Sequence, residues 1–145
     1  MSESYEKQLS NWVNQEKLAV NLLNSVGRLM YDKGIELVHF RRQLLEIGVS
    51  ELMNFISYAN NVVDRKNNIE TMNLLASEML NINLSSSKID IGLLTAEYLE
   101  EQQKDTNKFL TNKLKHIINA DTSSLDPKDV ILYGFGRIGR LAARK

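Results

Sequence analysis

Residues 18–30 have the sequence LAVNLLNSVGRLM. Apolar side chains recur there at intervals of four, four and three positions, at Leu18, Leu22, Val26 and Leu29. This spacing places side chains on one face of an α-helix, because the helix turns once every 3.6 residues. The pattern predicts one long amphipathic helix that includes Trp12 and Val13 upstream and ends at Gly34.

The elements directly after Gly34 are predicted to be short. Residues 35–40 alternate imperfectly between apolar and polar side chains, which indicates a short extended segment. Ser50 is then a plausible N-cap of a second helix, since its hydroxyl can accept a hydrogen bond from a free amide of the first turn. The inward face of that helix is predicted to comprise Leu52, Phe55, Ile56, Ala59, Val62 and Val63.

Three more helices are predicted before residue 120. A third helix begins near Asn68 and is broken by the serines at 85–87; its apolar face comprises Ile69, Met72, Leu75, Ala76, Met79 and Leu80. A fourth helix is capped by Asp90 and carries Leu94 and Tyr98. A fifth is capped by Asp105 or Thr106, with Leu110, Leu114 and Ile117 facing inward. Five helices joined by short polar loops predict a mainly α-helical, bundle-like domain.

The charge distribution divides the chain into two parts. The 145 residues carry 18 basic and 18 acidic side chains. Residues 1–126 hold 13 basic against 17 acidic side chains, whereas residues 127–145 hold five basic against one acidic. Pro127, the one proline, follows the polar run DTSS, so a boundary is expected between about 120 and 128. We therefore expect a helical domain over residues 1–126, followed by a segment too short to be a domain, which reads as the opening of one.

Composition excludes several classes of function. With 43% apolar and 25% charged residues the chain is typical of a globular protein, and the lack of cysteine removes thiolate nucleophiles and ligands. No apolar run approaches the ~20 residues that a bilayer requires. The start of the chain lacks the basic and apolar regions of a secretory signal, so a cytoplasmic location without a membrane partner is expected. Balanced charge and the lack of a basic stripe predict no nucleic-acid binding.

Single residues of the helical part suggest no chemistry. His39, between Val38 and Phe40, is expected to be packed or half-exposed. His116 is expected to interact with the dipole of the last helix rather than with a metal, because no second ligand lies three or four positions away. Trp12 is interpreted as a core or interdomain anchor. Arg41–Arg42 and Glu100–Glu101 are interpreted as solvated pairs. No catalytic residue and no metal site is predicted here.

Residues 127–145 contain the motif that does point to chemistry. Residues 130–133, VILY, have the β-branched and aromatic composition of a strand buried on both faces. The spacing G-x-G-x-x-G follows at once in Gly134, Gly136 and Gly139, and residues 140–145 are good helix formers. Strand, glycine turn and helix occur in the order that a dinucleotide site requires. The segment therefore predicts the first strand, turn and helix of a Rossmann α/β domain, truncated at Lys145.

Each glycine has a physical role in such a turn. Gly134 allows the tight turn out of the strand, Gly136 leaves room for the cofactor pyrophosphate, and Gly139 lets the helix pack closely on the strand. Main-chain amides at the helix start point at the phosphates, where the helix dipole adds favourable partial charge. The predicted cofactor-binding residues are Gly134, Phe135, Gly136, Arg137, Ile138 and Gly139.

Two other phosphate-binding loops fit these residues less well. Gly134 and Gly139 have the spacing of a P-loop, but Arg140 replaces the lysine and Leu141 replaces the hydroxyl residue that would ligate magnesium. A kinase glycine-rich loop leads into a second strand, whereas residues 141–145, LAARK, favour a helix. The dinucleotide interpretation is preferred.

The run GFGRIGR at Gly134–Arg140, preceded by an apolar strand, resembles the opening of the glyceraldehyde-3-phosphate dehydrogenase family, which erythrose-4-phosphate dehydrogenase shares. In that family the stretch binds the NAD pyrophosphate, and Arg137 and Ile138 match the positions credited with cofactor contact. Tyr133 stands where the family commonly has asparagine, so the hydrogen bond of that side chain is not carried over. Residues 1–126 resemble the helical extension of a long bacterial form, through Trp12, Tyr58–Ala59 and Ile89–Gly92.

The resemblance implies an NAD-dependent oxidation of a phosphorylated aldehyde in glycolysis by a homo-oligomer. The family reaction needs a cysteine thiolate and a histidine base, and the acidic residue that bonds the adenosine ribose lies about 20 positions past the glycines. Cysteine is lacking here and that acidic position falls beyond Lys145. The chain is therefore expected to be an N-terminal fragment that is inactive by itself. The alternative is a non-enzymatic helical interaction or regulatory module with a remnant glycine-rich tail.

Overall fold

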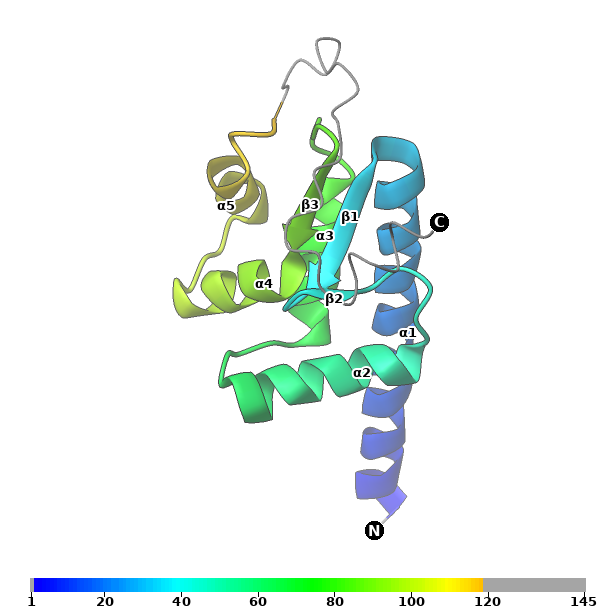
Figure 1. The fold of residues 1–145 in the computed structure, drawn as a ribbon. Helices are drawn as coiled ribbons and strands as arrows, with labels where there is room; N and C mark the ends of the chain where they lie inside the picture. Colours follow the sequence, from blue (N-terminus) through cyan, green and yellow to red (C-terminus); the bar gives the residue numbers. More distant parts are fainter. Residues whose placement is uncertain (1, 119–145) are drawn as a thin grey trace.

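The computed structural model describes residues 2–118. The predicted cofactor residues 134–139 and the expected boundary near Pro127 lie outside the described residues. Within residues 2–118 the elements follow the order α1 (Ser2–Lys33), β1 (Ile35–His39), β2 (Arg42–Gln43), α2 (Val49–Tyr58), the π-helical turn η1 (Ala59–Val63), α3 (Ile69–Met79), β3 (Ser87–Asp90), α4 (Ile91–Glu100) and α5 (Thr106–Lys113). Figure 1 shows α1 on one side of the body, α4 and α5 on the other, and the strands between them.

The long first helix is confirmed. Its buried side chains are Ala19, Leu22, Ser25, Val26 and Leu29. The helix ends at the predicted glycine, since Gly34 has φ 68°, in the left-handed region that favours glycine. A Cβ at Gly34 would also collide with the side chain of Ser86. The ammonium of Lys33 donates a 2.6 Å hydrogen bond to the carbonyl oxygen of Ile82, which ties this end of α1 to the loop after α3.

The expected extended segment is β1, the central strand of a sheet that the sequence analysis did not predict. The strand order is β2-β1-β3; β1 pairs antiparallel with β2 and parallel with β3, with Leu37 opposite Ile89. The bundle-like interpretation was therefore incomplete, because residues 2–118 are mainly helical around a small mixed sheet. Strand β2 has two residues and β3 four, too few for alternation to be recognised, and β3 begins at Ser87, within the serine run.

The predicted N-caps Asp90 and Asp105 are confirmed, and Asn68, predicted as the approximate start of the third helix, is also an N-cap. The side chains of Asn68, Asp90 and Asp105 accept hydrogen bonds from the amides of Thr71, Leu93 and Lys108 at 2.7, 3.1 and 3.1 Å. The prediction for Ser50 is wrong, because α2 begins at Val49 and its N-cap is Gly48, which has no side chain to bond the free amides. Helix α3 ends at Met79, well before the serines that were expected to break it.

The end of the second helix also departs from the predicted face. Leu52, Ile56 and Ala59 are buried as expected, but Val62 is 64% and Val63 37% exposed. From Ala59 to Val63 the helix adopts a π-helical turn, which has more residues per turn than an α-helix. The inward face was predicted with 3.6 residues per turn, so it misplaces Val62 and Val63, which the wider turn directs toward solvent.

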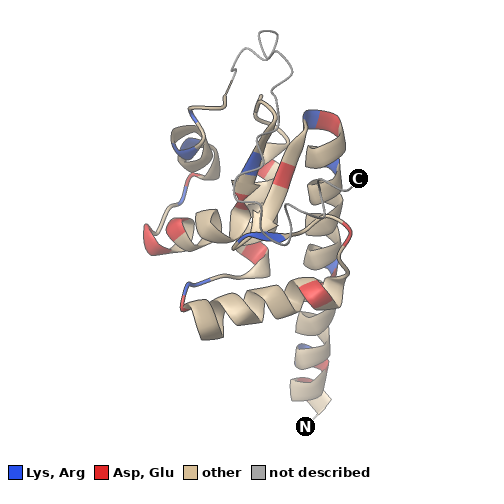
Figure 2. Cartoon of the chain, viewed as in Figure 1, with Lys and Arg blue, Asp and Glu red and all other residues tan. Residues whose placement is uncertain are grey.

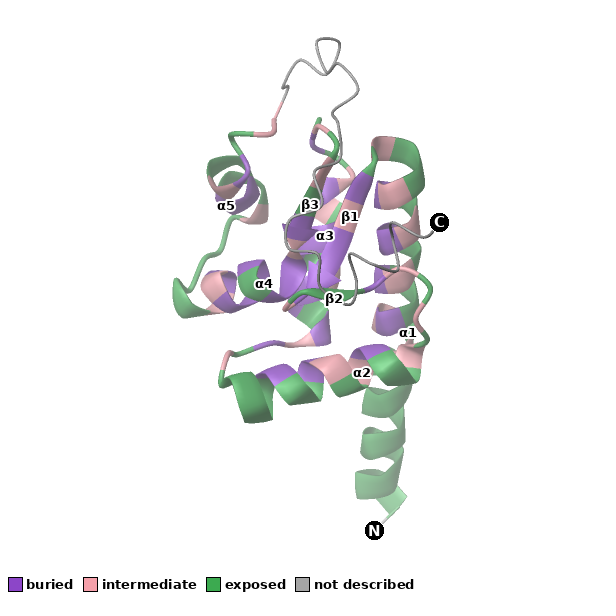
Figure 3. Cartoon of the chain, in the orientation of Figure 1, coloured by how far each residue is buried: buried purple, intermediate pink, exposed green. Residues whose placement is uncertain are grey.

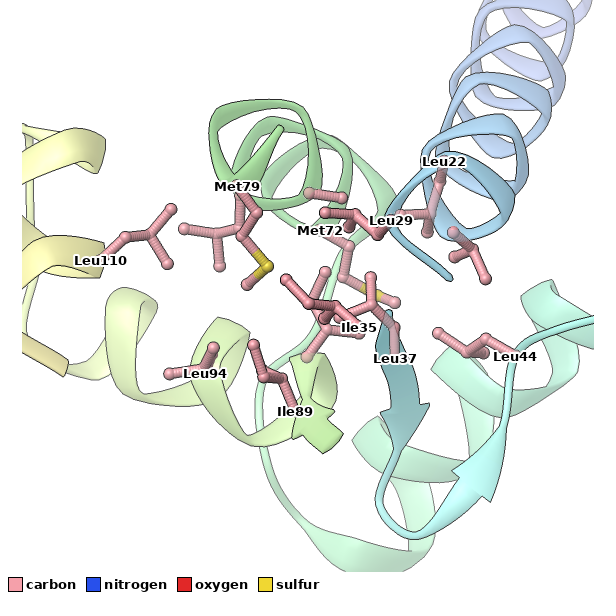
Figure 4. Packing of buried hydrophobic residues seen from close by; sticks show 14 of the residues in the cluster. Leu22, Leu29, Ile35, Leu37, Leu44, Met72, Met79, Ile89, Leu94 and Leu110 are labelled. Carbon is pink, nitrogen blue, oxygen red and sulfur yellow. The ribbon is translucent and has the colours of Figure 1, made fainter. Parts of the chain in front are cut away.

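The core lies where α1, α3 and β1 meet, and Figure 4 shows side chains of these elements interdigitating with those of β3, α4 and α5. Its largest fully buried side chains are Leu22, Leu29, Ile35, Leu37, Leu44, Leu52, Ile69, Met72, Leu75, Met79, Ile91 and Leu110. Every apolar position predicted for the α3 face is buried or packed against this core. None of the helices within residues 2–118 combines the length and apolar character needed to cross a bilayer.

Two adjacent leucines of α3 provide a test of this packing. Leu75 is fully buried and Leu74 is 48% exposed. We expect Leu75→Ala to lower the free energy of unfolding by about 2–5 kcal/mol, because it removes buried methyl groups and leaves a cavity. Leu74→Ala should change it by less than about 0.5 kcal/mol. Urea denaturation followed by circular dichroism measures both; equal effects would contradict the packing described.

Candidate functional site

The residues that the sequence predicts to bind a cofactor, Gly134, Phe135, Gly136, Arg137, Ile138 and Gly139, lie outside the described residues. Among the described residues, no group of three or more His, Asp or Glu side chains is placed to hold a metal ion. His116 is exposed and lies beyond the end of α5. The polar groups that the fold brings together lie instead around the turn between β1 and β2.

Asp90 is the centre of this cluster, which we call the turn cluster: His39, Phe40, Arg41, Asn67, Asp90 and Gly92. One carboxylate oxygen of Asp90 accepts hydrogen bonds from the amides of Phe40 at 2.9 Å and Leu93 at 3.1 Å. The other oxygen accepts from the amide of Arg41 at 3.3 Å. The same side chain therefore caps α4 and binds the turn between β1 and β2, 50 residues away in the sequence.

The turn that Asp90 binds has a strained backbone. His39 pairs with Arg42, so Phe40 and Arg41 form a two-residue hairpin loop. Their φ angles are 45° and 73°, as the favoured two-residue turn with positive φ at both positions requires. Asn and Gly normally occupy such turns, because other side chains are strained there. The Asp90 carboxylate offsets this strain by hydrogen bonding both turn amides.

A buried histidine and asparagine hold the other side of the turn cluster. Nε2 of His39 lies 3.1 Å from Oδ1 of Asn67. The amide nitrogen of Asn67 donates to the carbonyl oxygens of Gly92 at 3.1 Å and Lys66 at 2.9 Å. Since these bonds fix Oδ1 as the acceptor, Nε2 of His39 carries the proton in this hydrogen bond.

Asn67 is itself held by a second asparagine. Oδ1 of Asn60 accepts from the backbone amide of Asn67 at 2.9 Å, and the Asn60 side-chain nitrogen donates to the backbone oxygen of Asn67 at 2.9 Å. This two-way contact connects η1 to the loop before α3. Nothing in the local sequence distinguishes Asn60 or Asn67 from the other asparagines, so sequence reasoning missed both.

The first turn of α4 approaches the hairpin closely at Gly92. A Cβ at this position would lie 2.8 Å from the His39 ring and 2.9 Å from the Phe40 ring. A larger residue would therefore push α4 away from the turn and lengthen the bonds of Asp90. The requirement for glycine at position 92 is therefore steric.

Burial lowers the pKa of His39 below its ordinary value near 6.5. The hydrogen bond to Asn67 and the carboxylate of Asp90 oppose this shift, while the guanidinium of Arg42 adds to it. His39 is 1% exposed, so the expectation of a packed histidine is confirmed. Its hydrogen bond to Asn67 connects β1 to the loop before α3.

Arg42 is exposed, as expected, but its guanidinium is not fully surrounded by solvent. The Arg42 Cζ lies 5.1 Å from the centre of the Phe55 ring and 4.2 Å from that of Tyr58. These cation–π contacts hold β2 against α2. Arg42 therefore serves packing, and a role toward an anionic partner has no support from these contacts.

Glu100 and Glu101 are exposed as expected, but the interpretation that they have no positioned partner is wrong. Arg65 binds Glu100 with a 3.0 Å ion pair, and Lys113 binds Glu101 at 2.9 Å and Glu97 at 3.3 Å. The bond to Glu101 raises the pKa of Lys113, and the same bond lowers the pKa of Glu101. Figure 2 shows this acidic end of α4. The two pairs of Lys113 join α5 to the end of α4, and because these side chains are partly solvated the pairs contribute little to stability.

An open groove of about 860 Å³ lies beside these ion pairs. Residues that line it include Gln103, Asn107, Lys108, Phe109 and Lys115. Its polar side chains are exposed, and no nucleophile and base are paired in it, so it lacks the features of a catalytic site.

The surface of α1 presents the other notable feature. Trp12 is 59% exposed, so it is not part of the core of residues 2–118. Figure 3 shows the N-terminal half of α1 exposed all round, projecting beyond α2. A shallow groove along this helix is lined by Trp12, Val13, Glu16, Lys17, Val20 and Asn21. An apolar surface of this kind is typical of an interaction face.

No model of a known protein family matches the chain, and no curated protein matches it.

Asp90 caps α4 and also binds the amides of the turn, whereas Asp105 makes only the N-cap bond among the described residues. Comparing the two carboxylates tests what the turn bonds contribute. Asp105→Ala should lower the free energy of unfolding by about 1 kcal/mol, the usual cost of a lost N-cap. Asp90→Ala should cost about 2–4 kcal/mol, because the strained turn also loses a charged acceptor. Chemical denaturation of both variants measures the difference. Equal losses would show that the turn amides gain nothing from Asp90.

The lowered pKa of His39 makes stability depend on pH. Below about pH 6.5 the His39 side chain is protonated in the unfolded chain. In the folded chain it stays neutral until the pH reaches its lower pKa. We therefore expect the free energy of unfolding to fall as pH drops through this window, as measured by urea denaturation at several pH values. His39→Gln keeps a donor for Asn67 and should flatten this dependence. His116→Gln, at an exposed position, is the control and should leave it unchanged.

Proposed function

We propose that this chain is the N-terminal part of an NAD-dependent glyceraldehyde-3-phosphate dehydrogenase. The observation that carries the proposal is the run Gly134–Arg140, GFGRIGR, directly after the apolar residues 130–133. Seven consecutive residues agree with the family pattern, in the strand, turn and helix order of a dinucleotide site. The substrate class is then a phosphorylated aldehyde, and the intact protein is a homo-oligomer.

In this proposal the main chain of residues 134–139 binds the cofactor. Gly136 leaves space for the pyrophosphate next to the backbone, and the amides near Arg137 and Ile138 face its oxygens. Because recognition is by the main chain, Phe135 and the other intervening side chains need no special chemistry. NAD bound there would supply the hydride acceptor.

Residues 2–118 serve as an accessory domain in this proposal. Their buried polar groups form structural hydrogen bonds, and His39 is enclosed. Such a domain suits assembly, partner contact or regulation of the dehydrogenase that follows it. The chemistry of the family, a cysteine thiolate and a histidine base, would come from sequence past Lys145.

A second candidate function is a helical interaction module without enzymatic activity. The exposed apolar face of α1 favours this function, because such a face can bind a partner without a catalytic group. Translation of the coding sequence past Lys145 separates the two candidates. Further βαβ periodicity and a later cysteine support the dehydrogenase, whereas an immediate stop or polar low-complexity sequence supports the module.

The glycine motif is tested by Gly136→Val in a chain extended through its downstream coding sequence. The added side chain should occupy the pyrophosphate space and weaken NAD binding by at least about tenfold, as measured by titration calorimetry. Gly48→Val is the control, since a Cβ at Gly48 meets no neighbouring atom. Equal NAD affinity in the Gly136→Val protein and its parent would refute the motif assignment. The 145-residue chain alone should show no dehydrogenase activity.

A further inference from the structure

Helix α1 has two apolar faces, and the fold uses one of them. The first packs against α3 and β1. The second lies roughly a third of a turn round the helix, at 3.6 residues per turn. We call it the outer face; its apolar residues are Tyr5, Leu9, Trp12, Val13, Val20, Leu23 and Tyr31. Within the described residues Trp12 is 59% and Tyr31 74% exposed, so most of this face is uncovered, whereas Leu23 is half-buried and packs against the core.

The projecting half of α1 has little stability of its own. None of residues 2–17 is buried, and this stretch includes five poor helix formers: Ser2, Ser4, Ser10, Asn11 and Asn14. A helix of this length without tertiary contact is marginal in water. A second surface on the outer face would stabilise it by covering apolar side chains.

We propose that this second surface is α1 of another copy of this chain, packed antiparallel along the outer face. The proposal is independent of the NAD-binding role. In the arrangement we infer, Tyr5 lies beside Tyr31 of the second copy. The register then places Leu9 beside Gly27, Val13 beside Leu23 and Glu16 beside Val20. The contact runs from Tyr5 to Tyr31, a rise of about 39 Å at 1.5 Å per residue.

Side-chain sizes are complementary in this register. Gly27 lies in the middle of the outer face, and a Cβ there would meet no atom within 4 Å. Glycine in the middle of a helix costs about 1 kcal/mol relative to alanine, so its place there needs another reason. Opposite Leu9 of the second copy, Gly27 leaves the space that the leucine side chain fills.

Charges are complementary in the same register. Glu16 is the one acidic residue at the centre of the outer face, and it makes no ion pair within residues 2–118. Val20 of the second copy lies opposite Glu16, and Lys17 of that copy is three residues from Val20. Glu16 and Lys17 are therefore about 4.5 Å apart along the helix axis. Glu6 likewise lies about 3 Å along the axis from Arg28 of the second copy, on the same flank. The two copies are related by a two-fold axis, so each of these charge pairs occurs twice in the dimer.

Two other occupants fit these charges less well. Parallel, in-register pairing would place Glu16 beside Glu16 of the second copy and Glu6 beside Glu6, and these like charges repel. An anionic membrane surface would meet Glu3, Glu6 and Glu16 on the projecting half. The antiparallel pair is the arrangement that matches opposite charges and also covers the apolar residues.

Two equally exposed leucines test the surface. Leu9 on the outer face and Leu74 on α3 are both 48% exposed. By sedimentation equilibrium we expect the unaltered 145-residue chain and Leu74→Glu to form dimers with the same dissociation constant. Leu9→Glu should weaken the dimer by at least about tenfold, because its carboxylate would be buried without a partner. A monomeric parent chain, or equal weakening by both variants, would overturn the proposal.

A second experiment tests whether the two α1 helices run antiparallel. It uses introduced cysteines, because the chain has none of its own. Leu9→Cys and Gly27→Cys should each stay uncrosslinked alone and form a disulfide-linked dimer when mixed under mild oxidation. The control pair, Asn14→Cys and Asn21→Cys, lies on exposed positions away from the outer face and should not crosslink. Crosslinking of either outer-face variant alone would indicate a parallel pair and overturn the register. A mixture that crosslinks no better than the control would overturn the antiparallel contact.

Discussion

The carboxylate of Asp90 holds together elements that the chain brings in from distant positions. It binds two amides of a strained turn and one amide at the start of α4. The turn ends the central strand β1, and Asp90 ends β3, its parallel neighbour. A charged acceptor is well suited to this role, because its hydrogen bonds are about twice as strong as those between neutral groups. The sheet, the hairpin and α4 therefore depend on one side chain for their relative placement.

Around this carboxylate, the described residues direct their buried polar groups inward. His39 and Asn67 bond to each other, and the side chain of Asn67 also bonds to the backbone oxygens of Lys66 and Gly92. The outward-facing features are apolar and lie on α1. This division points to α1 as a contact surface. It agrees with both proposals, since an accessory domain of a dehydrogenase and a helical interaction module require the same kind of surface.

The candidate site shows where reading the sequence succeeds and where it fails. Capping by Asp90 was predictable, because a cap bond joins residues three positions apart. Its bonds to Phe40 and Arg41 were not, because they join residues about 50 positions apart whose meeting depends on the whole fold. Glu101 reads as a solvated helix end, and its partner Lys113 arrives through the loop before α5. The motif at residues 134–139 was found because its glycines and flanking segments are contiguous.

The sequence by itself determined the positions of the five α-helices, the N-caps Asp90 and Asp105, the glycine that ends α1 and the mainly helical class. These features follow from spacing and hydrogen bonds within a few residues, where local chemistry is sufficient. Only the tertiary structure decided that β1 pairs with β2 and β3 and that a π-helical turn rotates Val62 and Val63 outward. Strand pairing and burial depend on contacts between distant residues.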